Sequence, residues 1–279
     1  MQPNTTMLAA PPMDALHTHT LGQSFPWFTA VLYVILGLLW LLYMYAATRH
    51  RERPWSRWRA LSWSAGIVTI AIAIYPPFMH LAHLDFTVHM WSHLLLGMFA
   101  PLGLVLAAPV SLAMSTLPPR SARRLYKILN WPFFQIVSHP VSAMLLNVGA
   151  MYLLYMTPLY QLSQQLSWLS VLVHWHFLVA GYLFAWSIAG PDPAPNRPDM
   201  KFRCFILFFS VGAHATLAKL MYAYQWPRLS PHSVDDVQAG AQLMYWGGDV
   251  AELLLIVAFF ALWFRRAPAS ALQEMRKPA

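Results

Sequence analysis

Charged residues are scarce in this chain of 279 residues. Only 10% are Asp, Glu, Lys or Arg, whereas 58% are hydrophobic. Soluble domains carry about 25% charged residues, so this composition cannot cover the surface of a water-soluble globule. Apolar runs of about 18 or more residues recur along the chain, and each is long enough to cross roughly 30 Å of hydrocarbon. With a mean hydropathy of +0.46, the sequence predicts a polytopic membrane protein.

Cysteine is nearly absent, since Cys204 is the single one. An internal disulfide and a Cys-x-x-Cys metal or redox motif are therefore excluded. Residues 1–25 contain no Lys or Arg, so they lack the basic region of a cleavable signal peptide, and we expect the first apolar run to be a retained span. The chain also lacks a nucleophile triad, a phosphate-binding glycine loop and a dinucleotide fold, so no enzyme activity is expected.

The apolar runs predict an all-α bundle of about seven transmembrane helices. The expected spans are residues 26–47, 60–80, 87–109, 139–158, 169–189, 202–223 and 240–264. Between the third and fourth spans, residues 115–138 are mixed in character and read as an interfacial helix. The expected organisation is a tail at residues 1–25, a membrane domain at 26–265 and a second tail at 266–279.

The placement of the basic residues predicts the orientation. Sixteen of the 18 Lys and Arg residues lie in alternate loops and the carboxyl-terminal tail, on one side of the predicted membrane. The positive-inside rule assigns this side to the cytoplasm, with the amino terminus outside. The formal net charge of +8 sits in short loops that face anionic lipid headgroups. We therefore expect membrane lipid, and not nucleic acid, as the partner of these charges.

Ionisable residues inside the predicted spans are candidates for function. A charged group at the bilayer centre costs at least about 2.5 kcal/mol. At a helical rise of about 1.5 Å per residue, histidines of three spans lie in the outer half of the bilayer, with two carboxylates slightly deeper. The candidates are His89 and His93 in the third span, His174 and His176 in the fifth, His214 and Lys219 in the sixth, and Asp249 and Glu252 in the seventh.

The spacing of these residues suggests a metal site. His89 and His93 lie one helical turn apart, so both imidazoles can bind one ion, although each could instead be a hydrogen-bonded packing residue. His174 and His176 point about 200° apart on a helix, so we expect only one of them to line the site.

The carboxylates and the outer loops leave several alternatives open. Asp249 and Glu252 share a helix face and could balance a metal charge, relay protons or pair with Lys219. Outside the spans, the loop after the second span carries Met79, His80 and His83. These residues could recruit a soft metal such as copper(I), or they could simply be solvated. The same alternatives apply to the remaining outer residues, His17, His19, Asp85, His232, Asp235 and Asp236.

Several motifs resemble the CtaG family of the caa-type cytochrome c oxidase. They are His89-Met90-Trp91-Ser92-His93 with Ala100-Pro101 and Ala108-Pro109, then His174-Trp175-His176 with Gly190-Pro191-Asp192-Pro193, and the run from Gly240 to Asp249. Gly240-Ala241 departs from the paired glycine usual in that family.

The resemblance implies a protein of the bacterial cytoplasmic (inner) membrane that helps to assemble cytochrome c oxidase, with copper as its cargo. Oxidase subunits or other copper chaperones would be its partners. The motif positions that carry over are His89, His93, His174, His176 and Asp249, and copper ligation by them is an inference from their chemistry.

Two other classes of protein fit parts of the pattern. Histidines of different spans at equal depth can bind haem, as in a membrane redox protein. A proton-coupled metal transporter could use Asp249 and Glu252 as its relay, although polar groups become sparse toward the cytoplasmic side. The oligomeric state is left open by the sequence.

Overall fold

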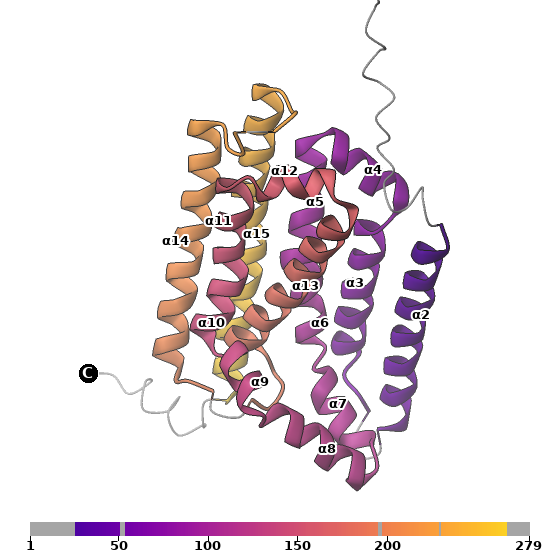
Figure 1. The fold of residues 1–279 in the computed structure, drawn as a ribbon. Coiled ribbons are helices and arrows are strands. Elements are labelled where there is room, and N and C mark those ends of the chain that lie inside the picture. The colour runs from indigo at the N-terminus through magenta and orange to yellow at the C-terminus, as the bar shows by residue number, and fades with distance from the viewer. Residues whose placement is uncertain (1–25, 51–53, 195–196, 229, 267–279) are drawn as a thin grey trace, which may run out of the picture.

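The computed structural model describes residues 26–50, 54–194, 197–228 and 230–266. Within these ranges every regular element is a helix (Figure 1), which confirms the predicted all-α bundle. The predicted tails, with His17 and His19, lie outside the described residues, apart from residue 266.

Five helical stretches are long and apolar enough to cross a membrane. They are α2 (Pro26–Arg49), the continuous stretch Phe86–Thr116, α13 (Ser167–Ala189), α14 (Met200–Tyr224) and α15 (Val234–Arg266). Two bent pairs add up to two more spans. In the first, α3 (Arg57–Ala73) and α4 (Pro76–Leu84) meet at 57°, and in the second, Pro140–Met156 meets α12 (Leu159–Gln165) at 80°. Counting each pair once gives the seven spans predicted.

The second predicted span is wrong in detail, because it is not continuous from residue 60 to residue 80. Pro76 has no backbone N–H and pushes the residue before it out of the helical region, and Tyr75 accordingly has an extended backbone with ψ of 124°. Consequently α3 ends at Ala73 and a new helix begins. His80 and His83, expected in a loop, lie on this new helix α4.

Two stretches are built from several shorter helices. Phe86–Thr116 comprises α5 (Phe86–Leu94), η2 (Leu95–Phe99), α6 (Ala100–Leu106) and α7 (Pro109–Thr116), and Pro140–Met156 comprises α10 (Pro140–Met144), η3 (Leu145–Gly149) and α11 (Ala150–Met156). Both η2 and η3 are π-helical, a form that is frequent at functional sites.

A proline accounts for the wide turn of η2. Pro101 cannot donate a hydrogen bond to the carbonyl of Gly97, and its ring would collide with that carbonyl in a regular α-helix. The Gly97 carbonyl instead faces α13 at Gly181, where an added Cβ would overlap its oxygen and lie 2.9 Å from its carbon. Glycine at this position therefore permits close contact between η2 and α13.

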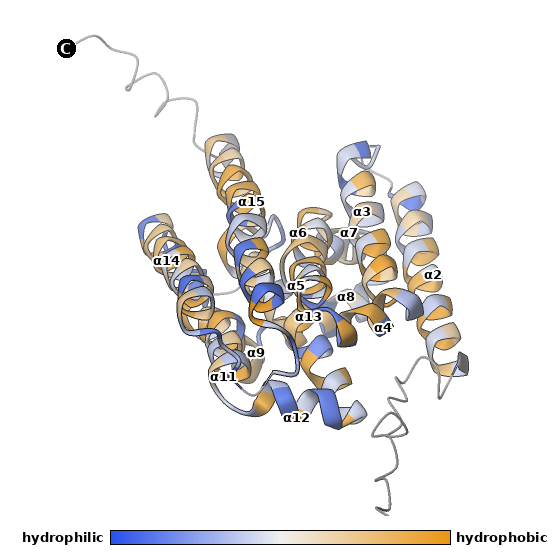
Figure 2. Cartoon of the chain, turned by 90° about the horizontal axis from the view of Figure 1, so that it is seen from above, coloured by the Kyte–Doolittle hydropathy of each residue, from blue (hydrophilic) through white to orange (hydrophobic). Residues whose placement is uncertain are grey.

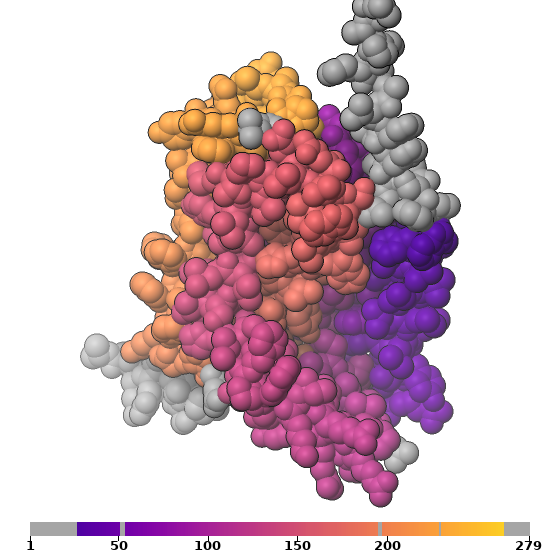
Figure 3. All heavy atoms as spheres, in the orientation of Figure 1, coloured from indigo at the N-terminus to yellow at the C-terminus, as the bar shows by residue number. Residues whose placement is uncertain are grey.

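The core is formed where α5, η2 and α6 pack between α13, α15 and α3. Helix α2 lies at the edge of the bundle against α3 and α7, and the segment from α8 to α12 covers the face shown in Figure 3. Apolar residues follow α2 and α3 along their length, whereas α12 is largely polar (Figure 2). Large apolar side chains point outward, among them Leu42 (64% exposed) and Phe208 (79% exposed), as expected of surfaces that face lipid.

Basic residues gather at one end of the bundle, which we call the basic end. Helix α8 (Pro119–Leu129), followed by α9 (Pro132–Val137), lies there together with the start of α14, whereas α4 and α12 lie at the opposite end (Figure 1). The segment predicted as interfacial thus contains a helix whose basic residues are exposed, namely Arg120, Arg123, Arg124 and Lys127.

Candidate functional site

His89 and His93 point into the bundle, as predicted. Their exposed fractions are 7% and 4%. The rotation of α5 is fixed at its start by two carboxylates. Asp85 accepts a hydrogen bond from the backbone N–H of Val88 at 2.9 Å, and Asp236 of α15 accepts one from Phe86 at 2.8 Å. Asp236, considered above as a possible metal-recruiting residue, therefore caps a distant helix.

A small cavity near the end opposite the basic end brings several predicted residues together. We call it the outer pocket. It has a volume of about 10 Å³, and its potential metal ligands are Met79, His83, His89 and His174. The ring centres of His89 and His174 are 6.5 Å apart, and His83 Nδ1 is hydrogen-bonded to Gln164 Oε1. Two of the residues predicted for metal recruitment, Met79 and His83, thus lie with two of the predicted ligands, His89 and His174.

His174 and His176 point in different directions, as their spacing predicted. His174 Nδ1 donates a hydrogen bond of 2.7 Å to the carbonyl of Ser170, so its Nε2 carries the free lone pair. His176 Nε2 donates a hydrogen bond of 2.9 Å to the carbonyl of Leu146 in η3. His174 therefore lines the outer pocket, and His176 ties α13 to the neighbouring span.

Aromatic side chains surround the outer pocket, and sequence reasoning missed them. Tyr155 places its hydroxyl 3.3 Å from His89 Nε2, and the ring centre of Tyr160 is 5.1 Å from that of His89. The Tyr160 hydroxyl is also hydrogen-bonded at 3.0 Å to Nε2 of His232 in the loop before α15. Burial lowers the pKa of His232, while the Asp236 carboxylate at 3.4 Å opposes that shift.

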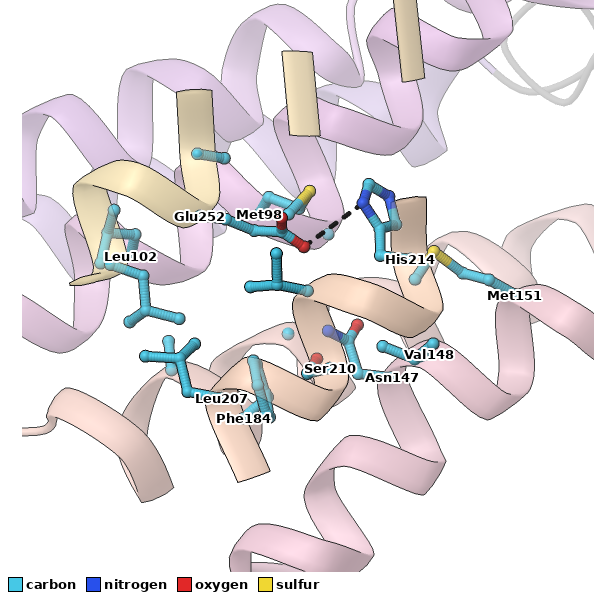
Figure 4. A pocket seen from close by; sticks show the side chains of 16 residues that line it. Met98, Leu102, Asn147, Val148, Met151, Phe184, Leu207, Ser210, His214 and Glu252 are labelled. Carbon is cyan, nitrogen blue, oxygen red and sulfur yellow. Dashed lines mark ion pairs between the residues drawn. The ribbon is translucent and has the colours of Figure 1, made fainter. Parts of the chain in front are cut away.

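A second cavity lies deeper in the bundle, and we call it the inner cavity. It has a volume of about 30 Å³, and most of its lining is apolar (Figure 4). Five helical segments also contribute polar and sulfur-containing side chains. They are Met98, Asn147, Met151, Ser210, His214 and Glu252. His214 Nδ1 and Glu252 Oε1 form an ion-pair contact of 3.3 Å. Within the described ranges, His214 Nε2 and Glu252 Oε2 are buried without a hydrogen-bond partner.

His93 lies beside this inner cavity. Gly97 lines the cavity, and an added Cβ at Gly97 would lie 3.5 Å from His93 Cε1. Neither ring nitrogen of His93 has a hydrogen-bond partner in the part of the chain that the structure describes. Sequence reasoning treated the histidines as one cluster, whereas the structure divides them between two cavities.

The ion pair considered for Lys219 does not form between the described residues. Lys219 Nζ lies 5.2 Å from the centre of the Tyr245 ring, and Glu252 pairs with His214 instead. Asp249 is half-buried and has no hydrogen bond or ion pair with another described residue. His80, also expected near the outer site, does not line the outer pocket.

Within the described ranges, no group of three or more His, Cys, Asp or Glu side chains has the arrangement of a metal site. What the described residues provide is imidazoles with methionine sulfur nearby, Met79 in the outer pocket and Met98 and Met151 in the inner cavity. Methionine and histidine are ligands that suit copper(I).

The remaining sequence motifs have a structural explanation. Asp192, which is 1% exposed, accepts hydrogen bonds from the backbone N–H groups of Val110 (3.2 Å) and Ser111 (2.7 Å) at the start of α7. It thereby joins the Gly190–Pro193 motif to Ala108-Pro109. On α15, Gly240 meets Phe86 and Gly248 meets the His214 ring, whose Nδ1 would be 2.8 Å from an added Cβ. Glycines of the last motif thus let α15 approach α5 and α14 closely.

Together, the fold and its buried histidines define a multi-pass helical membrane protein with polar cavities inside the bundle. A sequence model of the cytochrome c oxidase caa3 assembly factor family matches residues 41–266, and the chain belongs to this family.

Among curated relatives, the chain is 31% identical over 251 residues to an uncharacterized protein of Mycobacterium bovis, covering 83% of this chain and 38% of that protein. It is 28% identical over 263 residues to an uncharacterized protein of Mycobacterium leprae, covering 87% of this chain and 40% of the relative. The chain therefore spans about two fifths of the length of these relatives. No solved structure matches it.

Proposed function

We propose that this protein is a non-enzymatic assembly factor for cytochrome c oxidase that holds copper(I) in the outer pocket as cargo. Copper would pass from there to an oxidase subunit or to another copper chaperone. Four potential ligands from α4, α5 and α13 line this pocket, Met79, His83, His89 and His174, in a chain of an oxidase assembly family, and this carries the proposal.

The chemistry of the pocket suits copper(I). A metal ion between two imidazoles needs about 2 Å for each metal–nitrogen bond and roughly 1 Å more from each nitrogen to its ring centre. The 6.5 Å between the ring centres of His89 and His174 is of this size. The hydrogen bond from His174 Nδ1 to the Ser170 carbonyl is the support that metal-binding histidines typically have. Met79 adds a soft thioether ligand.

The location of the pocket fits the source of its cargo. With the basic end in the cytoplasm, as the positive-inside rule predicts, the outer pocket lies toward the outer face of the bacterial inner membrane. The rings of Tyr155 and Tyr160 pack against that of His89, with ring centres 6.1 Å and 5.1 Å away. Copper would thus be received and released on the outer side.

The test is copper(I) binding by purified protein in detergent, in competition with a chromophoric copper(I) chelator. The double variant His89→Ala/His174→Ala should bind at least tenfold more weakly, because it removes two nitrogen ligands. His139→Ala is the matched control, since this half-buried histidine lies near the basic end against Phe202. Equal affinity of the wild type and the double variant would contradict the proposal.

The same samples test the haem alternative through their absorption spectra. A Soret band in the wild type that disappears in the double variant would show that this pocket binds haem and not copper. Oxidase activity in membranes should fall with the double variant and remain with His139→Ala.

A further inference from the structure

We propose that the inner cavity is a second copper(I) site, in which His93 and His214 supply imidazole ligands, Met98 supplies a thioether and Glu252 positions His214. The cargo is that of the proposed function, on which this inference rests. The two sites use different residues, so each can be tested by itself.

The first observation is that polar atoms at this cavity are buried without partners. His93 is 4% exposed, His214 is 1% exposed and Glu252 is 6% exposed. Within the described ranges, both nitrogens of His93, Nε2 of His214 and Oε2 of Glu252 have no hydrogen-bond partner. Such unsatisfied groups destabilise a fold. A bound cation would take one nitrogen of each imidazole as a ligand, with Glu252 behind His214.

The contact between Glu252 and His214 prepares His214 as a ligand. At 3.3 Å from Glu252 Oε1, His214 Nδ1 carries the proton, and Nε2 keeps its lone pair. A carboxylate behind a ligating histidine fixes its orientation and raises its basicity. The negative charge of Glu252 also balances a monovalent cation inside the bilayer, where an unpaired charge is costly.

Both imidazoles lie at the cavity, close to sulfur. An added Cβ at Gly97 would lie 3.5 Å from His93 Cε1, and Gly97 and His214 both line the cavity. The next residue of η2 is Met98, which lines the cavity beside Glu252 (Figure 4). The volume of about 30 Å³ exceeds the roughly 10–15 Å³ that one water-sized occupant needs.

The inner cavity and the outer pocket are neighbours. The ring centre of Tyr155 lies 6.1 Å from that of His89 and 6.3 Å from that of His93, so one aromatic side chain contacts histidines of both cavities. Transfer between them would be ligand exchange at copper(I): nitrogens of His89 and His174 leave the metal as those of His93 and His214 bind. No electron is transferred, and the copper remains monovalent throughout.

The test is the copper(I) stoichiometry and affinity of the purified full chain, again against a chromophoric chelator. The wild type should bind two ions. His214→Ala should bind one, and the outer double variant His89→Ala/His174→Ala should also keep one. Should His214→Ala fail to fold, His214→Gln retains polarity and size and serves in its place, with size-exclusion chromatography as the check on folding.

Two further variants report on the roles of individual side chains. Glu252→Gln should weaken the inner site by roughly 10–100-fold, as expected for a residue that supports a ligand, and leave the outer site unchanged. Met98→Leu should remove copper–sulfur scattering from the X-ray absorption spectrum of the outer double variant, in which only the inner site remains. Unchanged scattering would exclude Met98 as a ligand.

The outcomes separate the two proposals. One ion, lost in the outer double variant and kept in His214→Ala, overturns the inner site and leaves the proposed function standing. One ion, lost in His214→Ala and kept in the outer double variant, supports the inner site and overturns copper binding in the outer pocket. If the wild type binds no copper(I), both proposals fall.

Discussion

Replacing Gly181 by Ala should strongly destabilise the bundle, because this residue sets the distance between α13 and η2. An added Cβ would overlap the carbonyl oxygen of Gly97, at 2.9 Å from its carbon and 3.0 Å from Pro101 Cγ. The obstacle is backbone and a proline ring, so no flexible side chain can rotate away. Ordinary contact requires α13 to retreat by about 1 Å, which forfeits a quarter to a half of the dispersion energy at each affected contact.

The expected loss is about 3 kcal/mol, at the upper end of the range for overpacking in a core. For a chain of this size, it corresponds to a fall in Tm of roughly 5–10 °C, measured by thermal unfolding in detergent. Gly212→Ala is the matched control, since it is an exposed helical glycine with nothing within 4 Å of an added Cβ. It should be neutral or slightly stabilising. Equal Tm values for Gly181→Ala and Gly212→Ala would refute the close contact between η2 and α13.

Further predictions test the capping carboxylate, the membrane lysine and the orientation. Asp192→Ala should lower the free energy of unfolding by about 3 kcal/mol, because it leaves the N–H groups of Val110 and Ser111 without their charged acceptor. Thermal unfolding measures this loss, and a stability equal to that of the wild type would contradict it. Lys219→Met should leave the amount of protein in the membrane unchanged, because Nζ faces the Tyr245 ring and no carboxylate. A clearly smaller amount on an immunoblot would instead support an ion pair between Lys219 and a carboxylate. A cytoplasmic reporter fused after Arg266 should be active, and one inserted between α14 and α15 should be inactive. The reverse pattern would invert the proposed topology.

The spans and the inward direction of His89 and His93 could be predicted from the sequence. The length of each apolar run predicts a span. The cost of placing a polar ring in lipid predicts that the two histidines point inward. The opposite directions of His174 and His176 also follow from helical geometry alone. These predictions succeeded because each depends on one helix and its solvent.

The grouping of the side chains could not be predicted, because it depends on contacts between distant helices. Depth alone placed His93 and His214 with His89 in one cluster. The rotation of α5, fixed by Asp236 from 150 residues away, and the wide turn of η2 at Pro101 divide them between two cavities. The pairing of Glu252 with His214, and not with Lys219, likewise depends on how closely α15 approaches α14 at Gly248.

Buried polar groups in this bundle fall into two kinds, and the contrast favours a ligand for the second kind. Asp192 and Asp236 come from loop or helix ends and accept hydrogen bonds from the first N–H groups of α7 and α5, so their carboxylates are satisfied by the fold itself. Like Asp192, and unlike the half-buried Asp236, the side chains of His93, His214 and Glu252 are buried, yet the described residues leave nitrogens and an oxygen of theirs without partners. The lipid around the bundle offers no hydrogen bond to such groups, and packing needs no unsatisfied imidazole where an apolar side chain would fit. This contrast supports the proposal that a ligand binds between these three side chains.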